Sequence, residues 1–201
     1  MVSPLAQSGN LLDRVGRVLR LDRAVFNEVE ADSTATGQAW TIVLVAAVSM
    51  ALAGFIQEVL GGLRFGNAVI ALVNGFLAAV IGFVVWAVVV QFIGTRLFGG
   101  TASLGEMIRT LGFAYSPNIF SILSGIPLLG IAVSLVLFVW VVLTGFFAVR
   151  EGLDLDTTKA ILTIVISLII VLVVTFLIAS VFTLFALVLG VGGMGFRWGM
   201  V

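Results

Sequence analysis

Cysteine and histidine are both absent from the 201-residue chain. Their absence excludes disulfides, thiol nucleophiles, imidazole general bases and most zinc, haem or copper sites. The glycines between positions 190 and 195 are not followed by the helix and lysine that a phosphate loop requires, so a nucleotide site there is excluded as well. We therefore expect no catalytic, cofactor-binding or metal-binding residues, and we expect that the protein is not an enzyme.

Charged residues are also scarce. They make up 10% of the chain and hydrophobic residues make up 61%, against about a quarter and about a half in soluble domains. A soluble core of this size cannot hide so many apolar side chains, whereas a bilayer accepts helices that are apolar on all sides. The ten acidic and ten basic residues cancel, which gives no reason to expect nucleic acid as a partner. The composition predicts an all-α fold, a polytopic bundle of transmembrane helices.

Long, mainly apolar runs predict about five membrane spans, and only the third carries charges, Glu106 and Arg109 near its start. The runs cover residues 39–56, 66–95, 104–124, 128–149 and 160–190. At 1.5 Å per residue the second run is about 45 Å long, more than the roughly 30 Å of a hydrocarbon core. It must project, bend or begin as an interfacial turn near Asn74 and Gly75. The chain thus divides into an N-terminal arm (1–38), a transmembrane domain (39–190) and a short Gly-rich C-terminal tail (191–201).

The third span carries signals for both its start and an interruption. Ser103 and Glu106 have the spacing of a capping box, which predicts that a helix starts there. Pro117 lies in the middle of the span, where its ring removes a backbone hydrogen bond. We expect a break or kink at residues 116–118, with Ser116 or Asn118 satisfying the carbonyl that the proline leaves free.

Two connections can be predicted as well. Residues 125–127 form a turn too tight for a polar loop, which predicts that the third and fourth spans make one transmembrane hairpin. Asp154 and Asp156 precede Thr157 in a good capping context, which predicts the start of the fifth helix.

The arm contains one amphipathic pattern. Between residues 11 and 29 the apolar side chains fall on one side of a helical wheel, and four arginines lie elsewhere around it: Arg14, Arg17, Arg20 and Arg23. Such a helix can lie on the membrane surface, where each arginine contributes on the order of 1 kcal/mol toward an anionic leaflet. It can equally pack against its own bundle. Acidic neighbours offset part of the attraction in either case.

The distribution of basic residues predicts the orientation. Eight would lie on one side of a five-span protein and two on the other. The eight are Arg14, Arg17, Arg20, Arg23, Arg96, Arg109, Arg150 and Lys159, and the two are Arg64 and Arg197. Because cytoplasmic loops are enriched in Lys and Arg, we expect a multi-pass protein of the cell (inner) membrane with its N-terminus in the cytoplasm and its C-terminus outside.

The chain resembles the Yip domain family, the Ypt-interacting proteins, which are small five-span membrane proteins. The resemblance rests on four stretches in order: residues 23–32 (RAVFNEVEAD) leading to Trp40, residues 111–127 (LGFAYSPNIFSILSGIP), then Gly130 and Trp140, and the last loop into Lys159. It covers most of the chain and implies the five-span fold. The Asp-Leu-x-Gly-Pro motif of eukaryotic members is missing from the arm, which weakens the case for a Rab-type GTPase partner. The short arm and compact loops resemble those of a prokaryotic-type member.

Polar and small residues within the spans favour packing over chemistry. Gly75 with Ala79, Ala78 with Gly82, and Gly112 with Ser116 have the small-xxx-small spacing that lets helix backbones approach closely. Whether they join helices within one molecule or between molecules stays open. Glu58 is the one acid near the interior of a span, and it is a candidate for an ion role, although an interfacial position explains it more simply.

These observations leave three functional hypotheses. The first is a non-enzymatic scaffold or adaptor that organises lipids or partner proteins, and the second is an accessory subunit of a larger membrane complex. The third is a small transporter or channel, which would need polar residues from several helices converging on a cavity at mid-membrane. We expect membrane lipids and other membrane proteins, or further copies of this chain, as the partners.

Overall fold

A computed structural model describes residues 9–62 and 65–188, and within these ranges every regular element is a helix. The order is α1 (Leu11–Leu19), α2 (Ala24–Ala31), α3 (Ala35–Leu60), α4 (Phe65–Phe98), α5 (Leu104–Ala114), the 3₁₀ helix η1 (Ser116–Gly125), α6 (Gly130–Gly152) and α7 (Thr157–Val188). The predicted all-α fold is confirmed. The predicted C-terminal tail lies outside the described residues.

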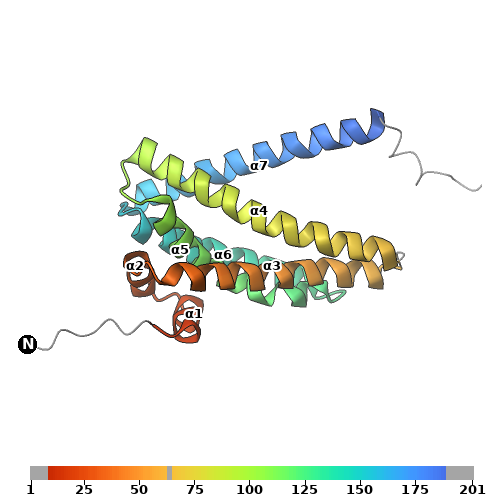
Figure 1. Ribbon diagram of the computed structural model, residues 1–201, viewed down its shortest axis with the longest axis horizontal. Coiled ribbons are helices and arrows are strands. Elements are labelled where there is room, and N and C mark those ends of the chain that lie inside the picture. Colours follow the sequence, from red (N-terminus) through yellow and green to blue (C-terminus); the bar gives the residue numbers. More distant parts are fainter. Residues whose placement is uncertain (1–8, 63–64, 189–201) are drawn as a thin grey trace, which may run out of the picture.

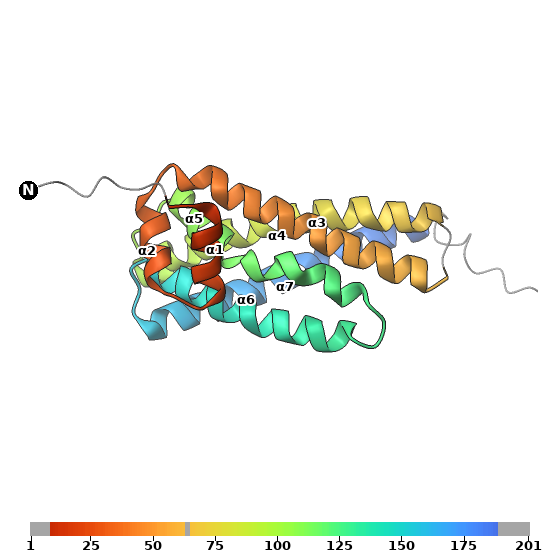
Figure 2. The ribbon, with the colours of Figure 1, turned by 90° about the horizontal axis from the view of Figure 1, so that it is seen from below.

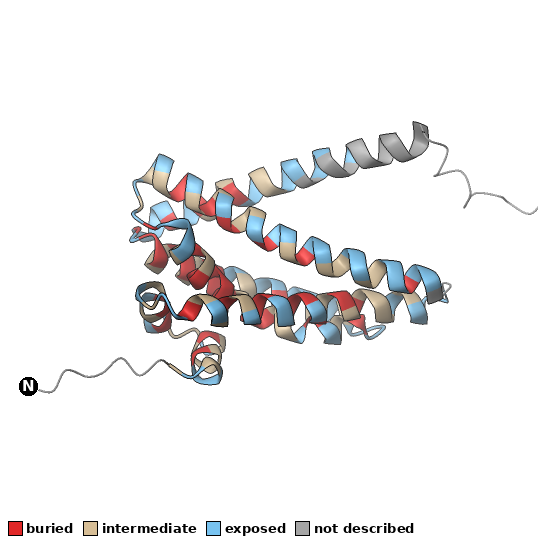
Figure 3. Ribbon diagram, in the orientation of Figure 1, coloured by how far each residue is buried: buried red, intermediate tan, exposed pale blue. Residues whose placement is uncertain are grey.

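The long helices run along one axis and form the bundle, while α1 and α2 lie across one end of it (Figures 1 and 2). In the described part of the chain, four helices are long and apolar enough to cross a membrane, namely α3, α4, α6 and the first part of α7. The pair α5–η1 runs beside them as the broken third span, which is consistent with about five spans in all. Figure 3 shows exposed residues along the outward faces of the long helices, where a bilayer would supply the apolar surroundings.

The second span is longer than predicted and unbroken. α4 has 34 residues, so it is about 51 Å long at 1.5 Å per residue. Since the helix continues through Asn74 and Gly75, the interfacial turn considered there is absent. The length must instead be accommodated by tilt or by projection beyond the hydrocarbon core.

The third span breaks at Pro117, as predicted. Ser103 and Glu106 form the capping box that begins α5, with Ser103 N donating to Glu106 at 2.7 Å and Glu106 N donating to Ser103 Oγ at 3.3 Å. α5 ends at Ala114, and the chain continues as η1. The carbonyl of Phe113 loses its donor at Pro117, and Ser116 Oγ donates to that carbonyl at 2.5 Å instead.

Side chains from neighbouring helices satisfy the rest of this break. Thr144 Oγ1 of α6 donates to the carbonyl of Ala114 at 2.8 Å. Ser49 Oγ of α3 donates to the Ile119 carbonyl at 2.7 Å and accepts from Ile122 N at 2.8 Å. Since lipid cannot replace lost backbone hydrogen bonds, these hydroxyls allow a non-α segment to exist at this depth.

Two of the predicted small residues, Gly112 and Gly75, make close contacts with another helix of the same molecule. A Cβ added at Gly112 would lie 2.8 Å from the Cβ of Ala39 on α3 and 3.3 Å from its Cα. At Gly75 the nearest atom would be Ala51 Cα at 3.4 Å, and the nearby Ala79 is 7% exposed. At Gly82 no heavy atom lies within 4 Å of the added Cβ. The close approach of helices therefore joins α3 to α5 at Gly112 and α3 to α4 at Gly75.

We expect Gly112→Ala to lower the melting temperature of the purified protein relative to Gly82→Ala. Both changes bring the same gain in helix propensity, so the difference between the two variants isolates the contact with Ala39. Overpacking at such a contact costs on the order of 1–3 kcal/mol. Thermal unfolding in detergent, followed by loss of the folded monomer, measures the difference. Equal melting temperatures would show that α3 and α5 do not approach this closely.

Candidate interaction surface

The N-terminal arm forms two short helices that cap the bundle. A single amphipathic helix over residues 11–29 was the expectation, and it is wrong because Leu21 has a φ of 61° and the chain leaves the helical conformation there. Asp22 then accepts from Ala24 N at 3.0 Å at the start of α2. We call α1 and α2 together the cap. Both lie across the bundle axis (Figures 1 and 2), which places them parallel to the plane of a membrane that the bundle spans.

The apolar side of the cap faces its own bundle. Val18, Val25, Phe26 and Val29 are all 0% exposed and belong to the hydrophobic core. Trp140 Nε1 of α6 adds a hydrogen bond to the Leu19 carbonyl at 3.2 Å. Of the two arrangements open from the sequence, the structure shows the arm packed against the protein.

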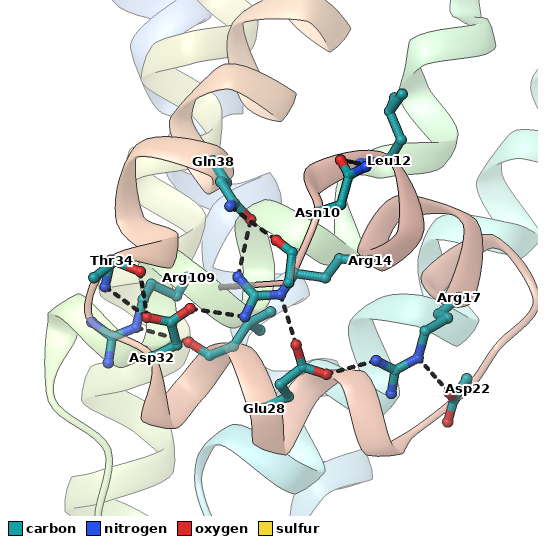
Figure 4. Close-up of polar contacts among 12 residues, drawn as sticks. Asn10, Leu12, Arg14, Arg17, Asp22, Glu28, Asp32, Thr34, Gln38 and Arg109 are labelled. Atoms are coloured by element: carbon teal, nitrogen blue, oxygen red, sulfur yellow. Dashed lines mark hydrogen bonds and ion pairs between the residues drawn. The ribbon is translucent and has the colours of Figure 1, made fainter. Parts of the chain in front are cut away.

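Arg14 is the centre of the polar side of the cap. It is 1% exposed, and each of its three guanidinium nitrogens donates a hydrogen bond (Figure 4). Nε donates to Glu28 and Nη2 to Asp32, both at 2.8 Å, and Nη1 donates to Gln38 Oε1 at 3.0 Å. A buried guanidinium requires this degree of pairing, because removing it from water without partners costs several kcal/mol. Arg14 therefore joins α1 to α2 and to the start of α3.

Glu28 extends this network to a second arginine. Arg17 Nη1 donates to Glu28 at 2.6 Å and Arg17 Nε donates to Asp22 at 2.8 Å. Burial acts to raise the pKa of Glu28, but the hydrogen bonds from Arg17 and Arg14 outweigh it and hold that pKa below its ordinary value. The hydrogen bonds from Thr34 and Arg14 likewise lower the pKa of Asp32. The network is therefore ionised at neutral pH.

A third arginine clamps the end of α2. Arg109 of α5 is 9% exposed, and its Nε donates to the carbonyl of Val29 at 3.0 Å while Nη2 donates to the carbonyl of Glu30. The last carbonyls of a helix have no partner within it, so a cation at this position is favourable. The sequence pattern placed Arg109 only among the basic residues of a loop, and its role in the cap could not be read from spacing.

The four arginines predicted at the surface divide into two pairs. Arg14 is buried and Arg17 is paired with two carboxylates, so these two are not free to face lipid headgroups. Arg20 and Arg23 are exposed, and the Arg23 guanidinium lies 5.9 Å from the ring centre of Phe147 on α6. The outward surface of the cap also carries Leu12, which is 75% exposed.

Carboxylates gather where α2 meets the neighbouring loops. Burial raises the pKa of Glu30 to about 7, and the negative charges of Asp154, Glu106 and Glu151 add to the shift while Arg109 opposes it. In the described part of the chain, no group of three or more acidic side chains is arranged to hold a metal ion. Glu30 is thus a titratable contact between the cap and the rest of the protein.

The remaining candidates lie away from the cap. Glu58 is half-buried in the last turn of α3, at the opposite end of that helix. Asn118 is half-buried in η1 and faces a cavity between α3 and α6. The structure therefore does not bring Glu58, the arginines and the broken span together into one site.

A family model described as the Yip1 domain matches residues 17–179. The match takes in most of the cap and all the membrane spans as far as α7, in agreement with the resemblance seen in the sequence. No curated protein and no solved structure matches the chain.

We expect Arg14→Met to loosen the cap and Arg20→Met to leave it unchanged. Removing one partner of a buried ion pair costs on the order of 3 kcal/mol, which would speed amide exchange in α1 roughly 100-fold. Hydrogen–deuterium exchange of the detergent-solubilised protein measures this rate. Similar exchange in the two variants would contradict the role given to Arg14.

We also expect the attachment of the cap to depend on pH. The pKa of Glu30 is about 7 in the docked cap against an ordinary 4.5, so the docked state binds the proton more tightly and its stabilisation is lost as pH rises through 7. Glu28 and Asp32 have lowered pKa values, so their stabilisation is lost when pH falls below their ordinary values. Exchange in α2, corrected for its intrinsic pH dependence, should be slowest near pH 5. Glu30→Gln should remove the loss between pH 5 and 8, and a pH profile identical to the wild type would refute the assignment.

Proposed function

Because the chain belongs to the Yip1 domain family, we propose that this multi-pass membrane protein works by association and not by catalysis. It would serve as a scaffold or adaptor, or as an accessory subunit of a larger membrane complex. The absence of Cys and His from the sequence supports a non-enzymatic role.

This proposal rests on one observation, the rigid attachment of the cap to the bundle. Arg17 joins α1 to α2 within the cap, while Arg14 attaches the cap to Gln38 of α3 and Arg109 of α5 attaches to the end of α2. The exposed residues of the cap include Leu12, Arg20 and Arg23, together with Asp13 and Asn27. An exposed leucine and exposed charges on a fixed support suit a protein partner at the membrane surface, because binding then requires little ordering of the surface itself.

The distribution of basic residues supports a cytoplasmic position for this surface. Eight of ten basic residues lie on the side of the N-terminus in a five-span topology, and the positive-inside rule assigns that side to the cytoplasm of a cell membrane. Membrane lipids and other membrane proteins are the proposed partners, and a further copy of the chain is a third possibility within the same role.

The alternative function is a small transporter or channel. A cavity beside the broken third span gives this alternative some support, since irregular backbone at membrane depth often lines binding sites. Glu58 lies at the end of α3, however, and not at its middle. A coupling carboxylate would be expected deeper in the membrane.

We expect Leu12→Ser to abolish co-purification of a partner from native membranes while leaving insertion and cap exchange rates unchanged. Val18→Ser is the matched comparison, because Val18 is 0% exposed and its change should loosen α1 as well. Quantitative mass spectrometry of the detergent-purified complexes gives the readout. If Leu12→Ser keeps every partner while Glu58→Gln abolishes an ion or solute flux in liposomes, the transporter function replaces the scaffold.

A further inference from the structure

A groove runs along the end of the bundle away from the cap, with η1 as its floor and α3 and α6 as its walls. It consists of an inner cavity of about 440 Å³ and an outer cavity of about 890 Å³. The two cavities share the lining residues Gln57, Ser124, Ser134 and Phe138, so they are continuous. Figure 2 shows η1 between α3 and α6 in this half of the molecule.

The inner cavity exposes polar side chains that the protein itself does not satisfy. Asn118 and Ser121 of η1 and Ser134 of α6 line it, and within the described residues their side chains make no hydrogen bond. Ser121 is only 7% exposed. By contrast, the nearby hydroxyls of Ser49 and Thr144 are occupied by the backbone of the broken span. The unpartnered groups are therefore not needed to hold η1 in place.

The depth of Asn118 and Ser121 in the membrane raises the free-energy cost of leaving their side chains without hydrogen bonds. α5 begins near the cap, and its 11 residues are followed by the 3₁₀ segment, so Asn118 and Ser121 lie roughly 20 Å or more from that end at 1.5 and 2.0 Å per residue. This depth lies within the hydrocarbon core. An unsatisfied polar group there costs more than in water, which favours a ligand that carries hydrogen-bonding groups of its own.

We propose that this groove binds an uncharged, hydroxyl-bearing lipid of the diacylglycerol class. The serine hydroxyls and the Asn118 amide can donate to its ester carbonyls and accept from its free hydroxyl. The apolar walls, which include Leu137, Phe138 and Val141 beside the inner cavity and Ile131 beside the outer one, would contact the acyl chains. This site is independent of the cap and of its proposed partner.

The residues that line the groove argue against two other occupants, a lipid with a phosphate headgroup and a transmembrane helix. Among the described residues that line the groove, none is charged, and a phosphate headgroup would lack the cation that usually binds it. A transmembrane helix about 10 Å across would displace on the order of 1,200 Å³ over three turns. Both cavities together reach about that volume, but the inner cavity, which Asn118 and Ser121 line, is only about 440 Å³ and falls in the range of small-ligand sites. A helix would therefore fill only the outer cavity and leave these two side chains without partners.

The test uses the purified full-length protein and a diacylglycerol with a photoactivatable group on one acyl chain. Phosphatidic acid and an O-methylated diacylglycerol with the same chains serve as comparison probes. We expect the diacylglycerol to label η1 and α6, and each of Asn118→Leu, Ser121→Ala and Ser134→Ala to reduce labelling about five- to tenfold, the loss typical of one hydrogen bond. Thr41→Val is the matched control, since the exposed Thr41 hydroxyl donates to Gly37 O on α3 and does not line the groove.

Ser134→Phe tests whether a loss of labelling could come from misfolding. Ser134 is exposed, so a ring there would fill the groove without disturbing the core. We expect it to abolish labelling while the protein keeps its melting temperature. Equal labelling by phosphatidic acid or by the O-methylated probe would overturn the proposal, and so would unchanged labelling in the groove variants. A change of oligomeric state in Ser134→Phe would show that another copy occupies the groove and would overturn the proposal. An absence of specific labelling in both the wild type and Thr41→Val would overturn it as well.

Discussion

The lack of water inside a bilayer is the constraint on which the architecture depends. A continuous helix meets it with its own hydrogen bonds, but the third span contains Pro117 and cannot. Hydroxyl groups supply the missing hydrogen bonds. Ser116 donates to the Phe113 carbonyl and Thr144 to the Ala114 carbonyl, while Ser49 donates to one backbone carbonyl of η1 and accepts from one of its N–H groups. These bonds fix α3 and α6 on either side of η1, and the groove between them is a consequence.

The cap is held by the opposite kind of chemistry. Charges that would be prohibitive in the hydrocarbon core occur at the end of the bundle, where carboxylates and arginines neutralise one another. The network has little tolerance for loss of a member, because Arg14 is almost fully buried and Glu28 accepts from two arginines at once. Removing one group leaves another without its partner. A shift in the protonation of Glu30 is a milder perturbation, since its partners are mainly other carboxylates.

Much of the fold could be predicted because its signals are local. The Ser103 capping box, the break at Pro117 and the start of α7 at Thr157 each depend on residues within one or two helical turns. The cap could be predicted only in part. The contacts of Arg14 with Glu28 and Gln38 span 14 and 24 residues, which no helical period connects, and the turn at Leu21 lies within a stripe that reads as one helix. Only the composition of the arm indicated that its arginines pair with carboxylates, because the arm carries about as many acids as arginines.

The polar residues of α3 show how one helix serves both ends of the molecule. Gln38 receives Arg14 in its first turn, Ser49 supports η1 in the middle, and Gln57 donates to the Ser124 carbonyl at 2.9 Å near its end. Gln38 and Ser49 are eleven residues apart, about three full turns, and so share a face of α3, whereas Gln57, eight residues beyond Ser49, lies about 80° further around the helix. Gly112 packs on Ala39, between Gln38 and Ser49, and so holds α5 against the same helix. Arg109 of α5 in turn donates to the last carbonyls of α2 in the cap. Because α3 carries all of these contacts, it is the common support of the cap, α5 and η1.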